Sequence, residues 1–412
     1  MRGSNDNVEP FNNTAENKLP PNRIGQAFKF VVFVCCLIGF SYQVIEFYLH
    51  FLTYPMASNF ELNERESFVL PALTFCNVNP VQRSKYCEKY PTRCYVPPEE
   101  EFCHAYPLSC KGNNATNLQI PMKKYLSDRP KPENRLTVSD IIELSQNSTE
   151  MDAINKYPGH GSEANSTSNF TRVYFTRSNK ELFLCYTTNA RYTNTPDPPD
   201  KKFDEDSATT FAYFALDVQP EEYFQYHEKH QFRFVMHSPY STTNPYVIGM
   251  PLRPGIAYKI HVLLREIELL PYPYITNCFD YHKSWKENGK PAPRSREMCV
   301  NNCQRRFNKE CYRCEKDLTF YLESDKICHN LGDLPCDAYR PIQEIEKDLK
   351  KCKKLCKPDC KSYVYEYTDT VEQISETMLE EQNLILVAII ADDPEVHSFM
   401  YLPQYQTLWI GN

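Results

Sequence analysis

The sequence predicts an α+β membrane protein, with one N-terminal transmembrane helix followed by a large, disulfide-rich and β-rich ectodomain. Three observations predict this class. One strongly apolar segment lies near the N-terminus, at residues 28–52. Two of the 18 cysteines, Cys35 and Cys36, lie inside that segment and the other 16 follow it, a density typical of an oxidising compartment. The 29 tyrosines and 24 phenylalanines favour aromatic-packed strands.

The apolar segment contains the uninterrupted run FVVFVCCLIGF at residues 30–40 and continues past Gln43 and Glu46 to Leu52. This gives about the twenty residues that a helix needs to cross a bilayer. A cleaved signal peptide is the alternative, but the apolar stretch is long for one and no A-x-A cleavage site follows it. Glu46 either faces a partner helix or an aqueous vestibule, or extends to the membrane interface.

The orientation follows from what lies beyond the segment. Arg23 and Lys29 flank its inner end, and four Asn-x-Ser/Thr sequons follow it in polar, loop-like sequence. Together with the cysteines, the sequons predict a cytosolic N-terminus and an ectodomain outside the cell or in a lumen. The predicted glycosylation sites are Asn114, Asn147, Asn165 and Asn169.

Composition and motifs exclude several functions. The net charge of −7 is diffuse, and no basic stripe indicates nucleic-acid binding. No H-E-x-x-H, G-x-S-x-G or phosphate-binding glycine loop is present, so we expect neither an enzyme nor a cofactor. The CYRC run at Cys311 and Cys314 has the spacing of a zinc or thiol-exchange motif, but no histidine array or βαβ pattern accompanies it. We therefore expect no metal site.

The first half of the ectodomain begins with a predicted strand within FVLPALTFCNVNP (residues 68–80), where Pro71 is acceptable at the strand start. A helix is predicted at TVSDIIELSQ, with Ser139 or Thr137 as its cap. Between them lies a block of four cysteines, expected to form two local bridges whose pairing the spacing leaves open: Cys87, Cys94, Cys103 and Cys110.

The second half contains segments rich in aromatic and β-branched residues, which predict successive strands. Gly255 supplies a turn before one of them. NLILVAIIA is too short to span a membrane and is followed by two aspartates, so a buried strand fits it better. The other predicted strands are ELFLCYTTN, FAYFALDVQ, QFRFVMHSPY and AYKIHVLLREIEL.

Ten cysteines lie between residues 278 and 360, with helical patterns at SREMCVNNCQRRF and IQEIEKDLKKCKKLC. In each helix two cysteines are four residues apart, which places both sulfurs on one face and allows disulfides between the helices. Glu344 and Asp348 also share a helix face, where a solvated surface is a simpler interpretation than acid sensing.

Six segments resemble, in the same order, the epithelial sodium channel/degenerin family, which includes the acid-sensing channels. The first is the single helix with the following LPALTFCNVNP. The others are LFLCYTTN, FALDVQPEEYF, FVMHSPY, PGIAYKIHVLLREIELLPYPYITNC and CKKLCKPDC. The resemblance implies a palm and β-ball core with a helical thumb. It divides the chain into a cytosolic N-terminus (1–27), a transmembrane helix (28–52), a wrist with the first palm strand (53–80), a finger-like insertion (81–180), palm and β-ball strands (181–277), a thumb (278–362) and a last palm strand leading to a second helix (363–412).

The resemblance also implies a disulfide pairing, which spacing alone leaves undetermined. Cys76 pairs with Cys185 in the palm. The thumb then contains a ladder of five nested disulfides: Cys278 with Cys360, Cys299 with Cys356, Cys303 with Cys352, Cys311 with Cys336, and Cys314 with Cys328.

The implied function is that of a subunit in a homo- or heterotrimeric, amiloride-sensitive sodium channel of the plasma membrane, gated by a ligand or another stimulus. Tyr54 and Tyr274 match the aromatic pair that couples thumb to pore at the wrist in this family.

Two features depart from the family pattern. The N-terminus lacks the His-Gly gating motif, and the chain stops at YQTLWIGN, where the second helix with its Gly/Ser-x-Ser filter would follow. We therefore expect this polypeptide alone not to conduct. The alternative function is a non-conducting single-pass ectodomain that binds ligand or suppresses channel assembly.

Overall fold

The computed structural model divides into two compact parts, which are described separately. One comprises Met1–Met56 with Pro403–Asn412, and the other Ala57–Leu402. The structure describes residues 23–64, 67–110, 118–126, 136–153, 170–176, 182–191, 201–202, 209–288, 292–312, 342–374, 383–391 and 395–404.

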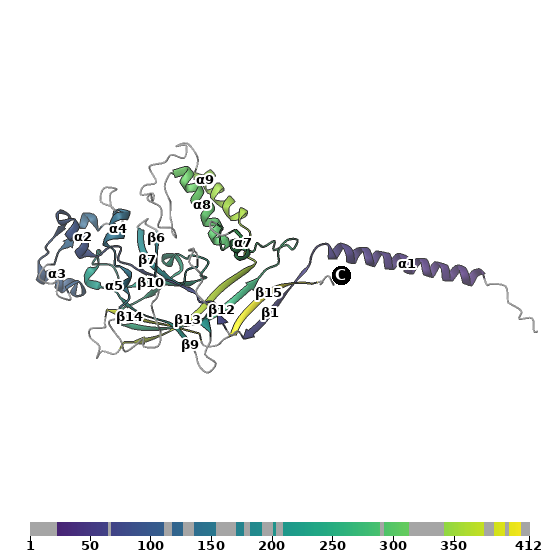
Figure 1. Cartoon of the computed structure of the whole chain (residues 1–412), viewed down its shortest axis with the longest axis horizontal. Coiled ribbons are helices and arrows are strands. Elements are labelled where there is room, and N and C mark those ends of the chain that lie inside the picture. Colours follow the sequence, from purple (N-terminus) through teal and green to yellow (C-terminus); the bar gives the residue numbers. More distant parts are fainter. Residues whose placement is uncertain are drawn as a thin grey trace, which may run out of the picture. The chain divides into compact units, whose positions relative to one another are not determined.

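In the first part, the apolar segment forms the helix α1 (Arg23–Phe51), which begins five residues before the predicted span (Figure 1). Its 29 residues extend for about 43 Å, more than the hydrocarbon thickness of a bilayer. Within the described residues, α1 is the one helix long and apolar enough to cross a membrane. Just beyond α1, the carbonyl of Pro55 accepts a hydrogen bond from the Gln404 amide at 3.0 Å.

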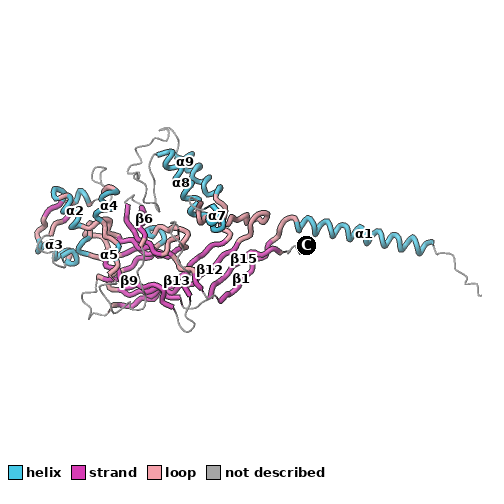
Figure 2. The backbone as a smooth tube through the Cα atoms, viewed as in Figure 1, coloured by secondary structure: helices cyan, strands magenta, loops and turns pink. Residues whose placement is uncertain are grey.

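The second part contains a six-stranded sheet built around β12 (Ile256–Glu268) (Figure 2). One edge of β12 pairs antiparallel with β13 (Lys361–Gln373) over all 13 residues. Its other edge pairs parallel with β14 (Leu384–Ala391) and then with β15 (Glu395–Pro403). The strands β9 (Thr209–Asp217) and β1 (Met56–Glu64) complete the sheet. Gly255 has a positive φ of 75° immediately before β12, as the predicted turn requires.

A five-stranded sheet lies against the first, with β3 (Ala72–Asn77) at its centre. All six residues of β3 are buried, because strands pair with it on both sides and both of its faces are covered. The other strands of this sheet, in spatial order around β3, are β11 (Met250–Leu252), β10 (Phe232–His237), β7 (Leu182–Thr188) and β6 (Thr171–Thr176).

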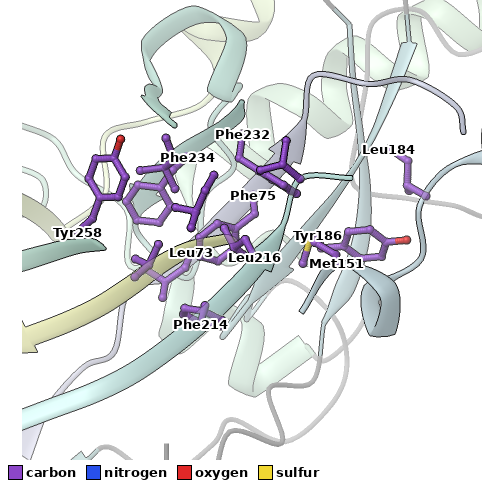
Figure 3. Packing of buried hydrophobic residues seen from close by; sticks show 14 of the residues in the cluster. Leu73, Phe75, Met151, Leu184, Tyr186, Phe214, Leu216, Phe232, Phe234 and Tyr258 are labelled. Carbon is purple, nitrogen blue, oxygen red and sulfur yellow. The ribbon is translucent and has the colours of Figure 1, made fainter. Parts of the chain in front are cut away.

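The main core fills the space between the two sheets (Figure 3). Phe75 of β3 lies at its centre, with its ring centroid 4.8 Å from that of Phe214 and 5.1 Å from that of Phe234. The opposite face of the five-stranded sheet has its own apolar cluster, which includes the Cys76–Cys185 disulfide and Met298. Cys76 and Cys185 lie directly opposite each other on β3 and β7, so the bridge crosses adjacent strands.

Short elements join these sheets. Thr137 caps α4 (Val138–Leu144), with its side chain accepting from the amide of Asp140 and the Asp140 carboxylate accepting in return. Of the two cap candidates in the sequence, the structure therefore uses Thr137.

The four-cysteine block forms two disulfides, Cys87–Cys94 and Cys103–Cys110. The remaining elements are α2 (Arg83–Lys89), η1 (Pro91–Arg93), α3 (Glu99–Ala105), η2 (Pro107–Cys110), η4 (Lys123–Tyr125), α5 (Ser148–Met151), η7 (Pro220–Glu222), α6 (Pro245–Ile248), α7 (Tyr281–Asn288), and the paired short strands β2 (Ser67–Phe68) with β8 (Lys201–Lys202) and β4 (Cys94–Tyr95) with β5 (Ile120–Pro121).

Candidate functional site

Two helices, α8 (Arg296–Tyr312) and α9 (Ile342–Leu355), form a covalently linked pair, which we call the helix pair (Figure 1). The disulfides Cys299–Cys356 and Cys303–Cys352 join them, with Cα–Cα distances of 5.9 and 5.7 Å. Because the cysteines of each helix are four residues apart, both bridges lie on the facing surfaces. Two parallel bridges prevent the helices from sliding or rotating past each other, so the pair moves as one unit.

Both ends of the chain segment that carries the helix pair return to the six-stranded sheet. The Cys278–Cys360 disulfide closes the segment. The amide of Leu269, just after β12, donates to the carbonyl of Cys360, just before β13, at 2.8 Å. The segment that carries the helix pair is therefore joined at its base to the adjacent strands β12 and β13 by a disulfide and a hydrogen bond.

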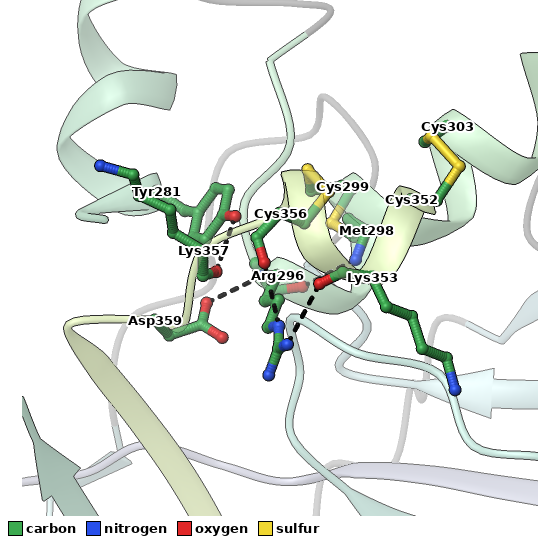
Figure 4. The surroundings of a disulfide bond; sticks show 11 residues. Tyr281, Arg296, Met298, Cys299, Cys303, Cys352, Lys353, Cys356, Lys357 and Asp359 are labelled. Atoms are coloured by element: carbon green, nitrogen blue, oxygen red, sulfur yellow. Dashed lines mark hydrogen bonds between the residues drawn. A yellow bond between two sulfur atoms is a disulfide. The ribbon is translucent and has the colours of Figure 1, made fainter. Parts of the chain in front are cut away.

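The base of the helix pair is held by Arg296, at the start of α8 (Figure 4). Its guanidinium donates to the carbonyls of Cys356 and Lys353 at the end of α9, at 3.2 and 3.3 Å. Its backbone amide donates to the carboxylate of Asp359 at 2.9 Å. The hydroxyl of Tyr281 donates to the carbonyl of Lys357 at 2.9 Å. The C-terminal end of α9, which has carbonyls without intrahelical partners, is thus capped by side chains from α7 and α8.

The loop after β10 meets the start of α8. The Ser295 hydroxyl donates to the carbonyl of Tyr240 at 2.6 Å, and the guanidinium of the buried Arg294 lies 4.8 Å from the Tyr240 ring centroid and 4.0 Å from that of Trp285. Arg191 donates to the Tyr240 hydroxyl at 3.1 Å. We call Arg191, Tyr240, Arg294, Ser295 and Glu297 the junction cluster, because it connects the helix pair to the five-stranded sheet.

Glu297 carries the ionisable carboxyl group of the junction cluster. Its carboxylate accepts a hydrogen bond from the Thr242 amide at 3.3 Å. Burial raises the pKa of Glu297 to about 7. The charge of Asp359 also raises this pKa, whereas the hydrogen bonds from Thr242 and Ser241 lower it. Burial also raises the pKa of Asp359. The base of the helix pair thus contains a carboxyl group that changes its charge near neutral pH.

A buried charge lies at the end of β12 that adjoins the helix pair. Alternate residues of β12 point into the core, and after Tyr258, Ile260, Val262 and Leu264 the next position in this row is Glu266. The fully buried Glu266 side chain is ion-paired with Lys361, the residue that follows Cys360. Burial alone would lower the pKa of Lys361, but pairing with Glu266 raises it overall.

The two tyrosines predicted to couple the thumb to the pore fall in different compact parts. Tyr54 has a positive φ of 49°, and its ring centroid lies 6.4 Å from that of Phe51. Tyr274 is half-buried in the turn between β12 and α7, where its amide donates to the carbonyl of Pro271 at 3.1 Å. Each tyrosine therefore occupies a tight turn at the end of an element.

The other predicted sites divide by location. Asn147 caps α5, with its side-chain oxygen accepting from the Glu150 amide at 2.7 Å. The pairs Cys311–Cys336 and Cys314–Cys328, and the sequon residues Asn114, Asn165 and Asn169, lie outside the described side chains. Among the described residues, no group of three or more His, Cys, Asp or Glu side chains could hold a metal ion. Asp348 forms an ion pair with Lys351 at 2.5 Å.

Sequence reasoning did not find the junction cluster. Its members come from the end of β7, the loop after β10 and the start of α8, and nothing in their spacing brings these segments together. Ser295 carried the one available signal, since a serine before a helical pattern is a typical N-cap. The structure agrees with that role, because its hydroxyl accepts from the Met298 amide at 3.1 Å.

Comparison with known proteins identifies the family. The sequence profile of the amiloride-sensitive sodium channel family matches residues 13–407, which includes α1, both sheets and the helix pair. A search of curated proteins found no match to the chain. The profile covers almost the whole sequence, in agreement with the resemblance carried by the six short segments. The chain therefore belongs to the amiloride-sensitive sodium channel family.

Proposed function

We propose that the chain is a subunit of a trimeric, amiloride-sensitive sodium channel of the plasma membrane, with its N-terminus in the cytosol and the residues beyond α1 outside the cell. Membership of an ion-channel family over residues 13–407 supports this function. One apolar N-terminal helix and six disulfides among the described residues fit a membrane anchor with an extracellular body.

The disulfide-linked helix pair is the observation that carries the proposed gating mechanism. It is rigid, it contacts the five-stranded sheet through the junction cluster, and its chain ends enter β12 and β13 beside the Cys278–Cys360 bridge. In our proposal a stimulus at the ectodomain tilts the helix pair, which corresponds to the thumb, and the tilt shifts these strands. Rigid elements moving between two discrete arrangements are a common form of switching.

In the same proposal, Tyr54 and Tyr274 transmit the movement to the membrane helices. Tyr54 lies three residues after α1, and Tyr274 lies between β12 and the helix pair. A half-buried aromatic ring at each of these positions supplies a large contact area at a small cost in conformational entropy.

The test is the sodium current in oocytes of this chain completed by a second membrane helix with its filter, recorded with and without amiloride. We expect Tyr274→Ala to abolish stimulated, amiloride-blocked current while surface expression stays at the wild-type level. The matched control is Ile275→Ala, because Ile275 is the next residue and its side chain is 85% exposed.

Normal gating in Tyr274→Ala would contradict the coupling role. A wild-type chain that reaches the surface, carries no current and reduces the current of co-expressed channel subunits would instead support the non-conducting, suppressive function.

A further inference from the structure

The outward face of α9 carries Lys347, Lys350 and Lys354, and Lys357 follows two residues after the helix ends; we call these four residues the lysine row. The spacing of three and four residues places the first three on one face of the helix. The cysteines that hold α9 to α8, Cys352 and Cys356, are each 3% exposed and lie on the opposite face. All four lysines are exposed.

This part of the chain has the opposite charge to the whole. Residues 347–357 contain six lysines and one aspartate, whereas the full chain has a net charge of −7. The aspartate, Asp348, is paired with Lys351, which is not in the row. Among the described residues, Lys347 and Lys354 have no acidic partner. The row is therefore a concentrated positive surface on an otherwise acidic protein.

Helix stability does not account for the lysine row. Cations near a helix C-terminus interact favourably with the macrodipole, but the effect is confined to the last turn, and Lys347 and Lys350 precede it. The carbonyl of Lys353 in the last turn of α9, and those of Cys356 and Lys357 just after it, already accept hydrogen bonds from Arg296 and Tyr281 (Figure 4). Like charges three and four residues apart repel each other and destabilise an isolated helix.

The disulfides of the helix pair keep the row in place. Cys352 and Cys356 fix α9 on the side opposite the lysines, so the backbone positions beneath the four charges are set before any ligand binds. A preorganised surface loses less conformational entropy on binding. With a rise of about 1.5 Å per residue, Lys347 and Lys354 lie about 10 Å apart along the helix axis.

We propose that the lysine row binds a sulfated polysaccharide of the cell surface or extracellular matrix. This inference rests on the extracellular orientation in the proposed function. A linear polymer with anionic groups on successive sugar units presents charges along a line, as the row does. Clusters of basic residues are known to form patches for heparin and other polyanions.

The composition of the row favours a charged polymer over a folded protein partner. The row consists of lysines alone, at exposed positions on α9 and just after it. Binding energy between proteins comes mainly from Trp, Tyr and Arg side chains that fill pockets, and the row contains none of these.

The test is the affinity of the full chain, in mild detergent, for soluble heparin, together with the salt concentration that elutes it from immobilised heparin. The variant is Lys347→Gln/Lys350→Gln/Lys354→Gln. We leave Lys357 unchanged because its ammonium donates to the Asn277 side chain at 3.0 Å. The control, Lys123→Gln/Lys229→Gln/Lys286→Gln, removes the same charge from exposed positions elsewhere.

We expect the α9 variant to bind heparin about 100-fold more weakly, since each basic residue beside an anionic surface contributes roughly fivefold. It should elute at lower salt, while the control variant elutes with the wild type. On a sulfopropyl cation-exchange column, which responds to total charge, the two variants should elute together.

Equal heparin affinity of the two variants would overturn the proposal. Displacement of heparin by polyglutamate at equal charge concentration would also overturn it, in favour of an acidic protein partner. Sodium current, recorded separately from the same two variants, tests the channel function independently of the binding result.

Discussion

At the scale of single residues, Glu297 links the charge of the helix-pair base to pH. In the unfolded chain its carboxyl group titrates near the ordinary pKa of 4.5, whereas burial keeps it protonated up to about pH 7 in the folded chain. Between these values the folded state binds more protons. The stabilisation from this group is therefore fully present below pH 4.5, falls as the pH rises, and is absent above about pH 7.

We predict that Glu297→Gln reduces the pH dependence of stability. Between pH 5 and pH 8 the wild type should lose up to about 3 kcal/mol more than the variant, since one pKa unit corresponds to about 1.4 kcal/mol. Thermal unfolding midpoints measured across this range give the comparison. Glutamine preserves the acceptor for the Thr242 amide, so the variant changes the charge but not the hydrogen bond.

The matched control for this prediction is Glu287→Gln, at an exposed position on α7. It should show the pH dependence of the wild type. If the unfolding midpoints of the wild type and of Glu297→Gln change with pH in parallel, Glu297 is ionised in the folded chain throughout the range from pH 5 to pH 8.

Glu297 also shows where sequence reasoning stops at this scale. Its neighbours in sequence predict an exposed charge in the first turn of a helix, a favourable place for a carboxylate. Its burial arises from the loop after β10, more than fifty residues earlier in the chain, which covers it through Thr242. The same holds for Glu266, which occupies a buried position in an otherwise apolar row. Its ion-pair partner, Lys361, lies 95 residues later in the chain.

At the scale of elements, the helix pair owes its rigidity to two disulfides. The outer bridge, Cys299–Cys356, already brings the helices together, so the inner bridge closes a further loop of only about ten residues. In the loop-entropy relation, such a closure contributes about 2–3 kcal/mol.

We therefore predict that Cys303→Ser/Cys352→Ser lowers the free energy of opening α9 by about 2–3 kcal/mol. Hydrogen exchange of the α9 amides should accelerate by roughly 30- to 150-fold, since about 1.4 kcal/mol corresponds to a factor of ten. The control is Cys103→Ser/Cys110→Ser, which removes a local disulfide beside α3 and should leave exchange in α9 unchanged. Equal hydrogen-exchange protection of the α9 amides in both variants would show that packing alone holds the helix pair together.

Several of the longer elements could be predicted from their own residues. The strands β7, β9, β10, β12 and β14 and the helices α4, α8 and α9 lie where the hydrophobic patterns predicted them. Their pairing could not be predicted in this way. β12 pairs with β13, β14 and β15 at once, and these contacts join residues about 90 or more positions apart, which local patterns do not encode.

At the scale of the whole molecule, the proposed orientation predicts that Asn147 carries a glycan. Thr149→Ala destroys this sequon but should preserve the cap of α5, because the Glu150 amide still donates to the Asn147 side chain. We expect the variant expressed in cells to lose one glycan-sized mass, seen as faster gel migration. Ser148→Ala changes the middle position of the sequon and should migrate as the wild type.

A wild-type chain whose mass is unaffected by glycosidase would contradict the predicted glycan at Asn147. That result would count against the proposed orientation, and with it against the exposure of the lysine row to extracellular polysaccharides.

The sequence by itself determined the membrane helix, the disulfide-rich β body, the cysteine faces of α8 and α9, and the family. These depend on features that are local, such as an apolar run or a spacing of four residues, or on short motifs in a fixed order. Only the tertiary structure decided the local pairing of Cys87 with Cys94 and Cys103 with Cys110, the burial of Glu297 and Glu266, and the junction cluster. The physical reason is that burial, pKa and ion pairing depend on which distant segments come into contact, and those contacts form only when the sheets and the helix pair pack together.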